Sequence, residues 1–424
     1  MVKPSFNVGD KIQITTKKDT ISGLFMPSKD NTIIIKLNTG YNIGIDKKNI
    51  KKIKLLEKNK PKKQKNTKIK KNSKLLTITI LHTGGTIASK VDYETGGVTA
   101  KFTAKDLLEM FPGLGKIANI NTELVSNMMS EDMLFSDYQK LASAVEKHAK
   151  KGVNGIIIGH GTDTLAYTAA ALSFMFEKIN IPVILVGSQR SSDRGSSDAN
   201  LNLICAARFI AESDFKGVAI CMHNSMSDDK CAILPATKTR KLHTSRRDAF
   251  QVVNDTPIAL IDPKSSKIEY LKKLPKKEDK IVLKKKFENK VGLLKTHTNM
   301  DPNLFKFFTK NYKAIVIEGT GLGHAPTNLG INLKNYEEIK KFIKKGGIVA
   351  ITSQCLFGRV HPNIYTNLRR LSEIGCVFCE DMLPETAHIK LSWLLGNYNK
   401  KEVEDLMLVN LRGEINPRIK DEFL

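Results

Sequence analysis

Two apolar runs that end in glycine-rich turns constrain the fold of this chain more than any other feature. The first run, residues 75–81, is followed by TGGTIA at 83–88, and the second, residues 156–158, is followed by GHGTDT at 159–164. A continuous apolar run before glycines is typical of a strand buried on both faces of a parallel sheet. Ligands of open α/β sheets bind at the carboxyl ends of such strands, so both turns are expected at one site.

The two turns present Thr86 and Thr162, and Asp163 follows the second threonine directly. A threonine hydroxyl is almost wholly protonated at neutral pH, so it acts as a nucleophile only with help from a neighbouring group. Two strand ends that meet at one edge of a sheet bring two hydroxyls and a carboxylate together. The pattern therefore favours nucleophilic catalysis.

Strands and helices alternate from residue 75 onward, which predicts parallel sheets covered by helices on both faces. The expected strands are 75–81, 120–125, 155–158, 183–186, 217–221, 314–317 and 347–351, and the expected helices are 103–111, 136–150, 164–176, 197–211 and 335–345. The segment Lys264–Lys290 carries 11 lysines and interrupts the alternation. We therefore predict two α/β domains, at residues 75–275 and 276–424.

Residues 1–56 differ from the rest of the chain and predict a small all-β unit. Four runs of alternating residues, at 8–14, 20–25, 31–37 and 41–45, are separated by Gly, Pro and Asp, as in an SH3-like barrel. From Lys47 to Lys74 the chain holds 14 lysines and one acid. Because such a segment cannot bury a core, residues 57–74 are expected to form a solvated linker, with a basic arm that contacts RNA as the alternative.

The net charge of +25 is compatible with a polyanionic partner such as RNA. Lysine greatly outnumbers arginine, however, and a biased base composition also produces that pattern. The chain has no apolar run of about 18 residues and begins without the apolar core of a signal peptide, so we expect a cytoplasmic protein without a membrane span. Six sparse cysteines indicate reduced thiols.

Several familiar sites are absent from the sequence. The turns do not have the GxGxxG spacing of a dinucleotide site, and GxxxxGK[ST], HExxH and GxSxG do not occur. We therefore expect no cofactor or metal in this chain, and any ATP chemistry has to lie in another protein.

The two turns, together with VGSQR at 186–190 and ATKT at 236–239, resemble the bacterial-type L-asparaginase family over residues 75–424. The β extension and the segments 92–100, 352–360 and 380–387 make the whole chain similar to a narrower family, the D subunits of archaeal-type glutamyl-tRNA(Gln) amidotransferases. The resemblance implies a two-domain asparaginase-like α/β fold with a small SH3-like extension.

The resemblance also implies catalytic roles. Thr86 would attack the side-chain amide carbon of glutamine, while Thr162, Asp163 and Lys238 would form a proton relay. Either threonine is a candidate to carry the acyl group. Tyr93 falls at the position of the family's flexible-loop tyrosine and would orient Thr86 as the loop closes.

Residues 130–132 lie where asparaginases carry a serine, a glutamine and an acid that bind the α-carboxylate and ammonium of the substrate. The resemblance assigns Ser130 and Glu131 to substrate binding, although Glu131 replaces the glutamine and argues against free asparagine as the substrate. The alternative is that these residues cap a helix that begins near residue 133.

The function implied is that of a glutaminase subunit, which supplies ammonia to an E-type transamidase subunit. That partner would use ATP and Mg²⁺ to convert Glu-tRNA(Gln) to Gln-tRNA(Gln), in a heterotetramer built on a homodimer of this chain. Two alternatives are a free-standing cytoplasmic L-asparaginase and an RNA-binding scaffold with a degenerate hydrolase domain.

Overall fold

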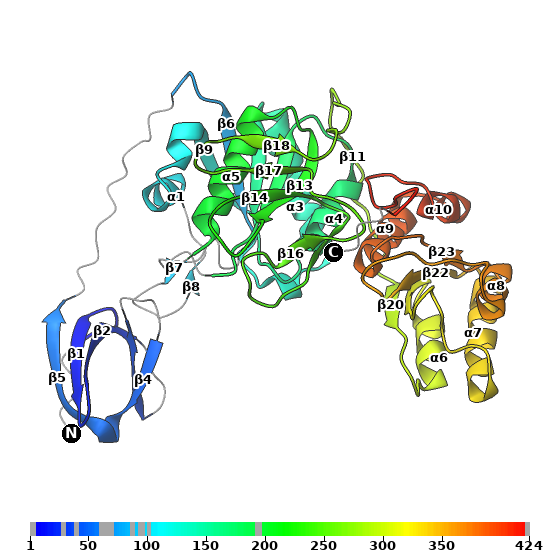
Figure 1. Cartoon of the computed structure of the whole chain (residues 1–424), viewed down its shortest axis with the longest axis horizontal. Coiled ribbons are helices and arrows are strands. Elements are labelled where there is room, and N and C mark those ends of the chain that lie inside the picture. The colour runs from blue at the N-terminus through cyan, green and yellow to red at the C-terminus, as the bar shows by residue number, and fades with distance from the viewer. Residues whose placement is uncertain are drawn as a thin grey trace.

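The computed structural model describes residues 6–26, 31–37, 42–58, 72–84, 90–91, 98–99, 103–190 and 197–419. They form an N-terminal β unit, an α/β domain with a large mixed sheet and a second α/β domain with a small parallel sheet (Figure 1). The sequence predicted these three parts in this order, and each has a buried core of its own.

The N-terminal β unit is an antiparallel sheet with the order β4-β3-β2-β1-β5. Its strands are β1 Lys11–Thr16, β2 Thr20–Met26, β3 Thr32–Lys36, β4 Asn42–Asp46 and β5 Ile50–Glu57, with the 3₁₀ helix η1 Lys47–Asn49 before β5. Strand β5 was not predicted, because lysines fill its exposed positions. Ile53 and Leu55 pack on the isoleucine core of the unit, so the strand still has one apolar side.

The sheet of the first α/β domain has eight strands in the order β18-β17-β14-β13-β12-β10-β6-β9. These are β6 Thr77–His82, β9 Asn119–Leu124, β10 Gly155–Gly159, β12 Pro182–Val186, β13 Gly217–His223, β14 Cys231–Pro235, β17 Ala259–Ile261 and β18 Ile268–Tyr270. The strands from β9 to β13 run parallel, as predicted, whereas β14, β17 and β18 are antiparallel. The expectation of a purely parallel sheet is therefore wrong at this edge.

Helices cover both faces of this sheet: α1 Ala104–Met110, α2 Leu114–Ile117, α3 Phe135–Lys150, α4 Leu165–Met175 and α5 Ala199–Glu212. Thr103 and Asp106 form the capping box that begins α1. In α3, Tyr138, Leu141 and Val145 recur at helical spacing and are buried, so this helix has one apolar side.

Three two-stranded ribbons lie outside the large sheet. They pair β7 Lys90–Val91 with β8 Val98–Thr99, β11 Phe176–Lys178 with β19 Val282–Leu283, and β15 Thr239–Lys241 with β16 Phe250–Val252. The ribbon β15-β16 matters for function, because it carries a lysine into the candidate site.

The second α/β domain has a parallel sheet in the order β20-β21-β22-β23. Its elements are β20 Val291–Lys295, β21 Ala314–Gly319, β22 Ile348–Ser353 and β23 Val377–Phe378, with α6 Pro302–Asn311, η4 Gly330–Asn332, α7 Leu333–Lys344, α8 Thr366–Glu373, α9 Pro384–Asn397 and α10 Lys400–Met407. In the part of the chain described, no helix is long and apolar enough to cross a membrane.

Helix α9 joins the two α/β domains (Figure 1). It packs on the small sheet and also on α4, where the rings of Phe174 and Trp393 stack with centroids 5.9 Å apart. The buried residues of both domains form one continuous cluster at this junction. This explains why α4 is apolar all round: one side faces its own sheet and another faces α9.

Candidate active site

The carboxyl ends of β6, β10 and β12 meet at one edge of the large sheet. The backbone N–H of Thr83 donates to Gly159 O at 3.1 Å, and that of His160 donates to Val186 O at 3.0 Å. These bonds continue the parallel ladders by one residue and bring the turns after the three strands together. The predicted meeting of the first two turns is confirmed as far as Gly84, the last described residue of the first turn.

Glycine is required where these turns touch their neighbours. Gly84 has φ of 103°, and a Cβ there would stand 2.5 Å from Met128 O. A Cβ on Gly161 would stand 2.9 Å from Ser130 Oγ. The glycines therefore let the segment around residues 128–130 approach both turns, as a site built from several loops requires.

The loop after β12 is held by the buried carboxylate of Asp198. It accepts hydrogen bonds from Ser188 Oγ at 2.9 Å and from the backbone N–H of Gln189 at 3.0 Å. Asn202 Nδ2 donates to Gly187 O at 3.1 Å. Residues 187–190 are thus held in place and support the turn that carries Thr162, against which Gly187 packs.

A lysine joins the two polar residues of the second turn. Lys241 Nζ donates to Thr162 Oγ1 at 2.9 Å and lies 2.7 Å from Asp163 Oδ1. The Lys241 side chain is 13% exposed, whereas Asp163 is 66% exposed and can be reached from solvent. The lysine places a positive charge beside Oγ1, which stabilises the oxygen when it loses its proton. Because Oγ1 is the acceptor in this bond, the hydroxyl hydrogen of Thr162 is free to bond to another acceptor.

The predicted contact of Lys238 with Asp163 is wrong. Lys238 Nζ instead donates to Asp381 Oδ2 at 2.6 Å and to Asp381 O at 2.9 Å, and both side chains are fully buried. Lys238 lies in the turn at residues 236–238 that precedes β15, and its side chain is buried against Asp381, whereas Lys241, the last residue of β15, reaches the second glycine turn.

Residues 130–132 form a 3₁₀ turn, η3 Ser130–Asp132, against the second glycine turn. Thr164 Oγ1 donates to Ser130 O at 2.6 Å, and Ser130 is buried while Glu131 is exposed. The alternative role as a helix cap is wrong, because α3 begins only at Phe135. Ser130 and Glu131 therefore lie beside the cluster formed by Thr162, Asp163 and Lys241.

His160 supports the second turn from inside the protein. Its Nδ1 lies 2.7 Å from Gly161 O, and its Nε2 lies 2.8 Å from Thr168 Oγ1. Since a carbonyl only accepts, Nδ1 carries the proton and Nε2 accepts from the threonine. Burial lowers the pKa of His160 to about 4, so the ring is neutral at physiological pH.

Thr86 and Tyr93 lie outside the described residues, so the roles assigned to them stay predictions. Within the described ranges, no group of three or more His, Cys, Asp and Glu side chains is placed to hold a metal ion. The described part of the site thus consists of Thr162, Asp163 and Lys241, with Ser130 and Glu131 beside them.

Family models match three parts of the chain. Residues 77–276 match "Asparaginase, N-terminal", residues 290–407 match "Glutaminase/Asparaginase C-terminal domain", and residues 6–56 match "GatD N-terminal domain". The three matches follow one another as the three structural parts do.

Curated relatives are similar over the full chain. The D subunit of the glutamyl-tRNA(Gln) amidotransferase from Methanococcus maripaludis is 46% identical over 427 residues, which cover 98% of this chain and 100% of the relative. Its counterpart from Thermococcus kodakarensis is 46% identical over 439 residues, which cover 100% of this chain and 98% of the relative.

Solved structures are similar over the two α/β domains. The thermostable L-asparaginase from Thermococcus kodakarensis matches with a TM-score of 0.72 and 31% identity, covering 81% of this chain and 100% of its own. L-asparaginase I from Vibrio cholerae matches with a TM-score of 0.68 and 27% identity, and the match covers 81% of this chain and 99% of the asparaginase. The N-terminal β unit is thus matched by a family model and the curated relatives.

Proposed function

This chain belongs to the family of glutamyl-tRNA(Gln) amidotransferase D subunits, and we propose that it hydrolyses glutamine to glutamate and ammonia for such an enzyme. A partner transamidase subunit of the E type would use the ammonia, with ATP and Mg²⁺, to convert Glu-tRNA(Gln) to Gln-tRNA(Gln). Relatives that are named as one component of a larger enzyme support the need for a partner.

The contact that carries this proposal is the bridge from Lys241 Nζ to Thr162 Oγ1 and Asp163 Oδ1. Hydrolysis of an amide through a covalent intermediate needs a nucleophile and groups that move protons to and from it. The bridge holds a hydroxyl, an ammonium and a carboxylate at one strand end, which is the set of groups that this chemistry needs.

In the proposed reaction Thr86 Oγ1 forms a bond to the amide carbon of glutamine, and the C–N bond breaks. The proton that the Thr86 hydroxyl loses passes through Thr162, which Lys241 and Asp163 hold in place, to the nitrogen, which leaves as ammonia. Water then cleaves the ester, which releases glutamate and restores the hydroxyl. In the alternative form of this scheme, Thr162 carries the acyl group in place of Thr86.

The oligomer belongs to the same proposal: a homodimer of this chain at the centre and one E-type partner on each copy. Ammonia released before an acceptor is ready is lost to solvent. Coupling of glutamine hydrolysis to the partner and to charged tRNA would prevent this loss. A free-standing asparaginase has no such requirement.

Thr162→Val tests the proposal, because valine keeps the shape of threonine and removes the hydroxyl. In the complex with the partner, Gln-tRNA(Gln) formation from glutamine is expected to fall at least about a hundredfold. Formation from added ammonium chloride is expected to continue at the wild-type rate. Equal loss with both nitrogen donors would contradict a role of this site in ammonia release.

A free-standing asparaginase is the competing outcome, since solved asparaginases share the fold. It predicts hydrolysis of asparagine by the isolated chain, in preference to glutamine and without stimulation by charged tRNA. Measuring both amides in the same assay separates the two functions.

A further inference from the structure

The ribbon that carries Lys241 is not part of the large sheet. Within the residues that the structure describes, β15 pairs with β16 in a two-stranded sheet of their own. An isolated two-stranded ribbon is at best marginally stable in water. Contacts from elsewhere must therefore fix β15, and with it the position of Lys241.

Helix α4 and Pro235 contact β15 from its own domain, and the buried ion pair and a second charged contact come from one stretch of the second α/β domain, which we call segment 381–386. It lies just before and at the start of α9. Asp381 accepts from Lys238 Nζ at 2.6 Å, and Glu385 Oε1 lies 3.0 Å from Arg240 Nε. Lys238, in the turn before β15, and Arg240, on β15, thus both contact the second domain.

The backbone before β15 is bound by the same segment. Thr386 Oγ1 donates to Thr237 O at 3.0 Å, and both threonines are buried. Thr237 Oγ1 in turn donates to Arg412 O at 3.0 Å, in the C-terminal tail, residues 408–419. Three of the four residues directly before Lys241 are therefore attached to other parts of the fold through their side chains or carbonyls.

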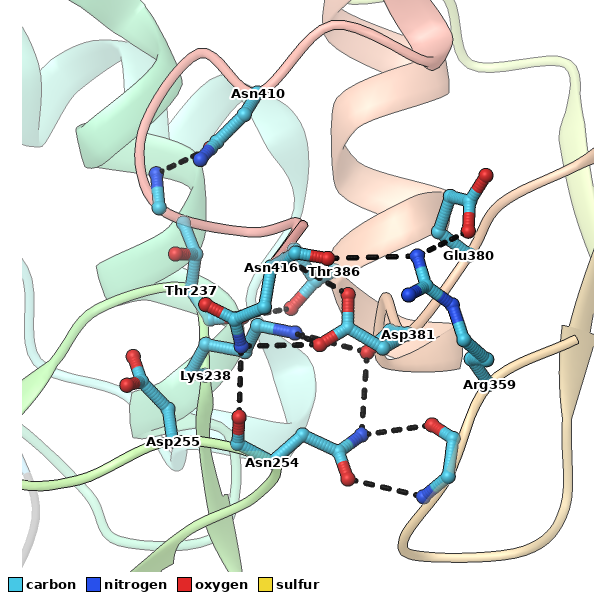
Figure 2. A network of polar contacts seen from close by, with 12 residues as sticks. Thr237, Lys238, Asn254, Asp255, Arg359, Glu380, Asp381, Thr386, Asn410 and Asn416 are labelled. Atoms are coloured by element: carbon cyan, nitrogen blue, oxygen red, sulfur yellow. Dashed lines mark hydrogen bonds and ion pairs between the residues drawn. The ribbon is translucent and has the colours of Figure 1, made fainter. Parts of the chain in front are cut away.

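The carboxylate of Asp381 is fully engaged. Besides Lys238, it accepts from the backbone N–H of Asn416 at 2.9 Å and from Asn416 Nδ2 at 3.0 Å. Asn416 Nδ2 also donates to Asn254 O at 2.7 Å, two residues beyond β16. Figure 2 shows Lys238 and Asp381 at the centre of these contacts, where β15, segment 381–386 and the tail meet.

The Lys238–Asp381 pair is better suited to fixing geometry than to adding stability. Both side chains are fully buried, and the cost of removing two charges from water largely cancels their attraction. Burial lowers the pKa of Lys238, while the charge of Asp381 opposes that shift. The pair nevertheless defines one arrangement, because every polar atom has a partner with fixed geometry.

We propose that segment 381–386 is a positioning element of the active site, which holds β15 so that Lys241 reaches Thr162 and Asp163. Lys238, Arg240 and Asp381 are positioning residues in this sense, because each acts on Lys241 through β15. A shift of β15 by about 1 Å would break the bridge from Lys241 to the second turn. The expected effect on kcat for glutamine rests on the proposed function, whereas the expected effect on the position of Lys241 does not.

The test removes the buried charges in pairs, so that neither charge is left alone. The test variant is Lys238→Met with Asp381→Asn. The matched control is Lys390→Met with Glu414→Gln, because this pair has the same separation of 2.6 Å and is also fully buried. Lys390 lies on α9 and Glu414 in the C-terminal tail, and neither side chain contacts β15 among the contacts that the structure describes.

Two quantities are measured on each full-length protein. The first is the rate at which acetic anhydride modifies Lys241 in the folded chain, followed by mass spectrometry of the peptide. The second is kcat and KM for glutamine in the complex with the partner. The test variant is expected to raise the modification rate of Lys241 severalfold and to lower kcat about tenfold to a hundredfold, with KM nearly unchanged.

The control pair is expected to change neither quantity by more than about twofold. Equal effects of the two pairs on Lys241 modification would overturn the inference. A wild-type complex without amide hydrolysis would contradict the proposed function instead, and the modification rates would still decide the inference. If the test variant does not fold, Thr386→Val takes its place: faster modification of Lys241 supports the inference, and an unchanged rate overturns it.

Discussion

Gly187 and Thr162 are in direct contact across the candidate site. A Cβ on Gly187 would stand 2.8 Å from Thr162 Cγ2 and 3.1 Å from Leu165 Cδ1. Threonine is branched at Cβ and has few rotamers, so Thr162 cannot turn away while keeping its bond from Lys241. The absence of a side chain at residue 187 thus decides where the Thr162 hydroxyl lies.

Gly187→Ala is therefore expected to lower kcat for glutamine about tenfold or more, because the methyl group displaces Thr162. Steady-state kinetics of the complex measure the effect. Gly44→Ala is the matched control, since a Cβ at Gly44 meets nothing within 4 Å, and its activity should equal that of the wild type. Equal kcat for Gly187→Ala and the wild type would show that the position of Thr162 is unimportant.

Lys241→Met is expected to lower glutamine hydrolysis by at least about a hundredfold, because it removes the ammonium that donates to Thr162 Oγ1 and pairs with Asp163. Lys230→Met serves as control, since Lys230 pairs with Glu269 on the surface of the same domain and should have little effect. Glutamate release by the complex measures both. A loss below about threefold for Lys241→Met would remove this lysine from the proposed mechanism.

The second glycine turn could be predicted from sequence because its chemistry is local: a buried strand, two glycines, a threonine and an aspartate follow one another. The choice between Lys238 and Lys241 could not be made that way. It depends on which side of β15 faces the turn and which faces segment 381–386, and tertiary packing decides this.

The fold was predictable where strands are long and apolar. The parallel strands from β9 to β13 follow from runs such as residues 156–158, which are buried on both faces. Strands β17 and β18 of the antiparallel edge were missed because they have three residues each, too few for a pattern to appear. Strand β5 was missed because its exposed lysines resemble the lysine-rich segment that follows, and residues 59–71 of the predicted linker lie outside the described residues.

His160 makes the stability of the first α/β domain depend on pH. Its folded-state pKa is lowered from 6.5 to about 4, so the folded protein resists a proton that the unfolded chain accepts. Stability is therefore full above about pH 6.5 and falls as the pH approaches 4. Between pH 7 and pH 5, His160 lowers the free energy of unfolding by about 2 kcal/mol.

The measurement is the difference in melting temperature between pH 7 and pH 5. It is expected to be about 4 to 8 °C smaller in His160→Gln than in the wild type. His297→Gln, at an exposed histidine, is the control and should reproduce the wild-type difference. An unchanged difference in His160→Gln would mean that this ring is protonated equally in both states.

Glu131→Gln tests the part of the site that is expected to bind the α-amino and α-carboxylate groups. Removing the carboxylate is expected to raise kcat/KM for asparagine relative to glutamine severalfold, because the site then carries the glutamine typical of asparaginases. Glu337→Gln, at an exposed acid on α7, should leave this ratio unchanged. A ratio that stays constant in Glu131→Gln would place the selectivity elsewhere.

The most direct test of the central claim is the steady-state release of glutamate by the purified chain alone, with the partner subunit, and with the partner and Glu-tRNA(Gln). A glutaminase subunit should be nearly idle alone and should rise by at least about tenfold in the complete assembly, with asparagine a poor substitute. Full activity of the isolated chain, unchanged by partner and charged tRNA and with asparagine preferred, would contradict the account and identify a free-standing asparaginase.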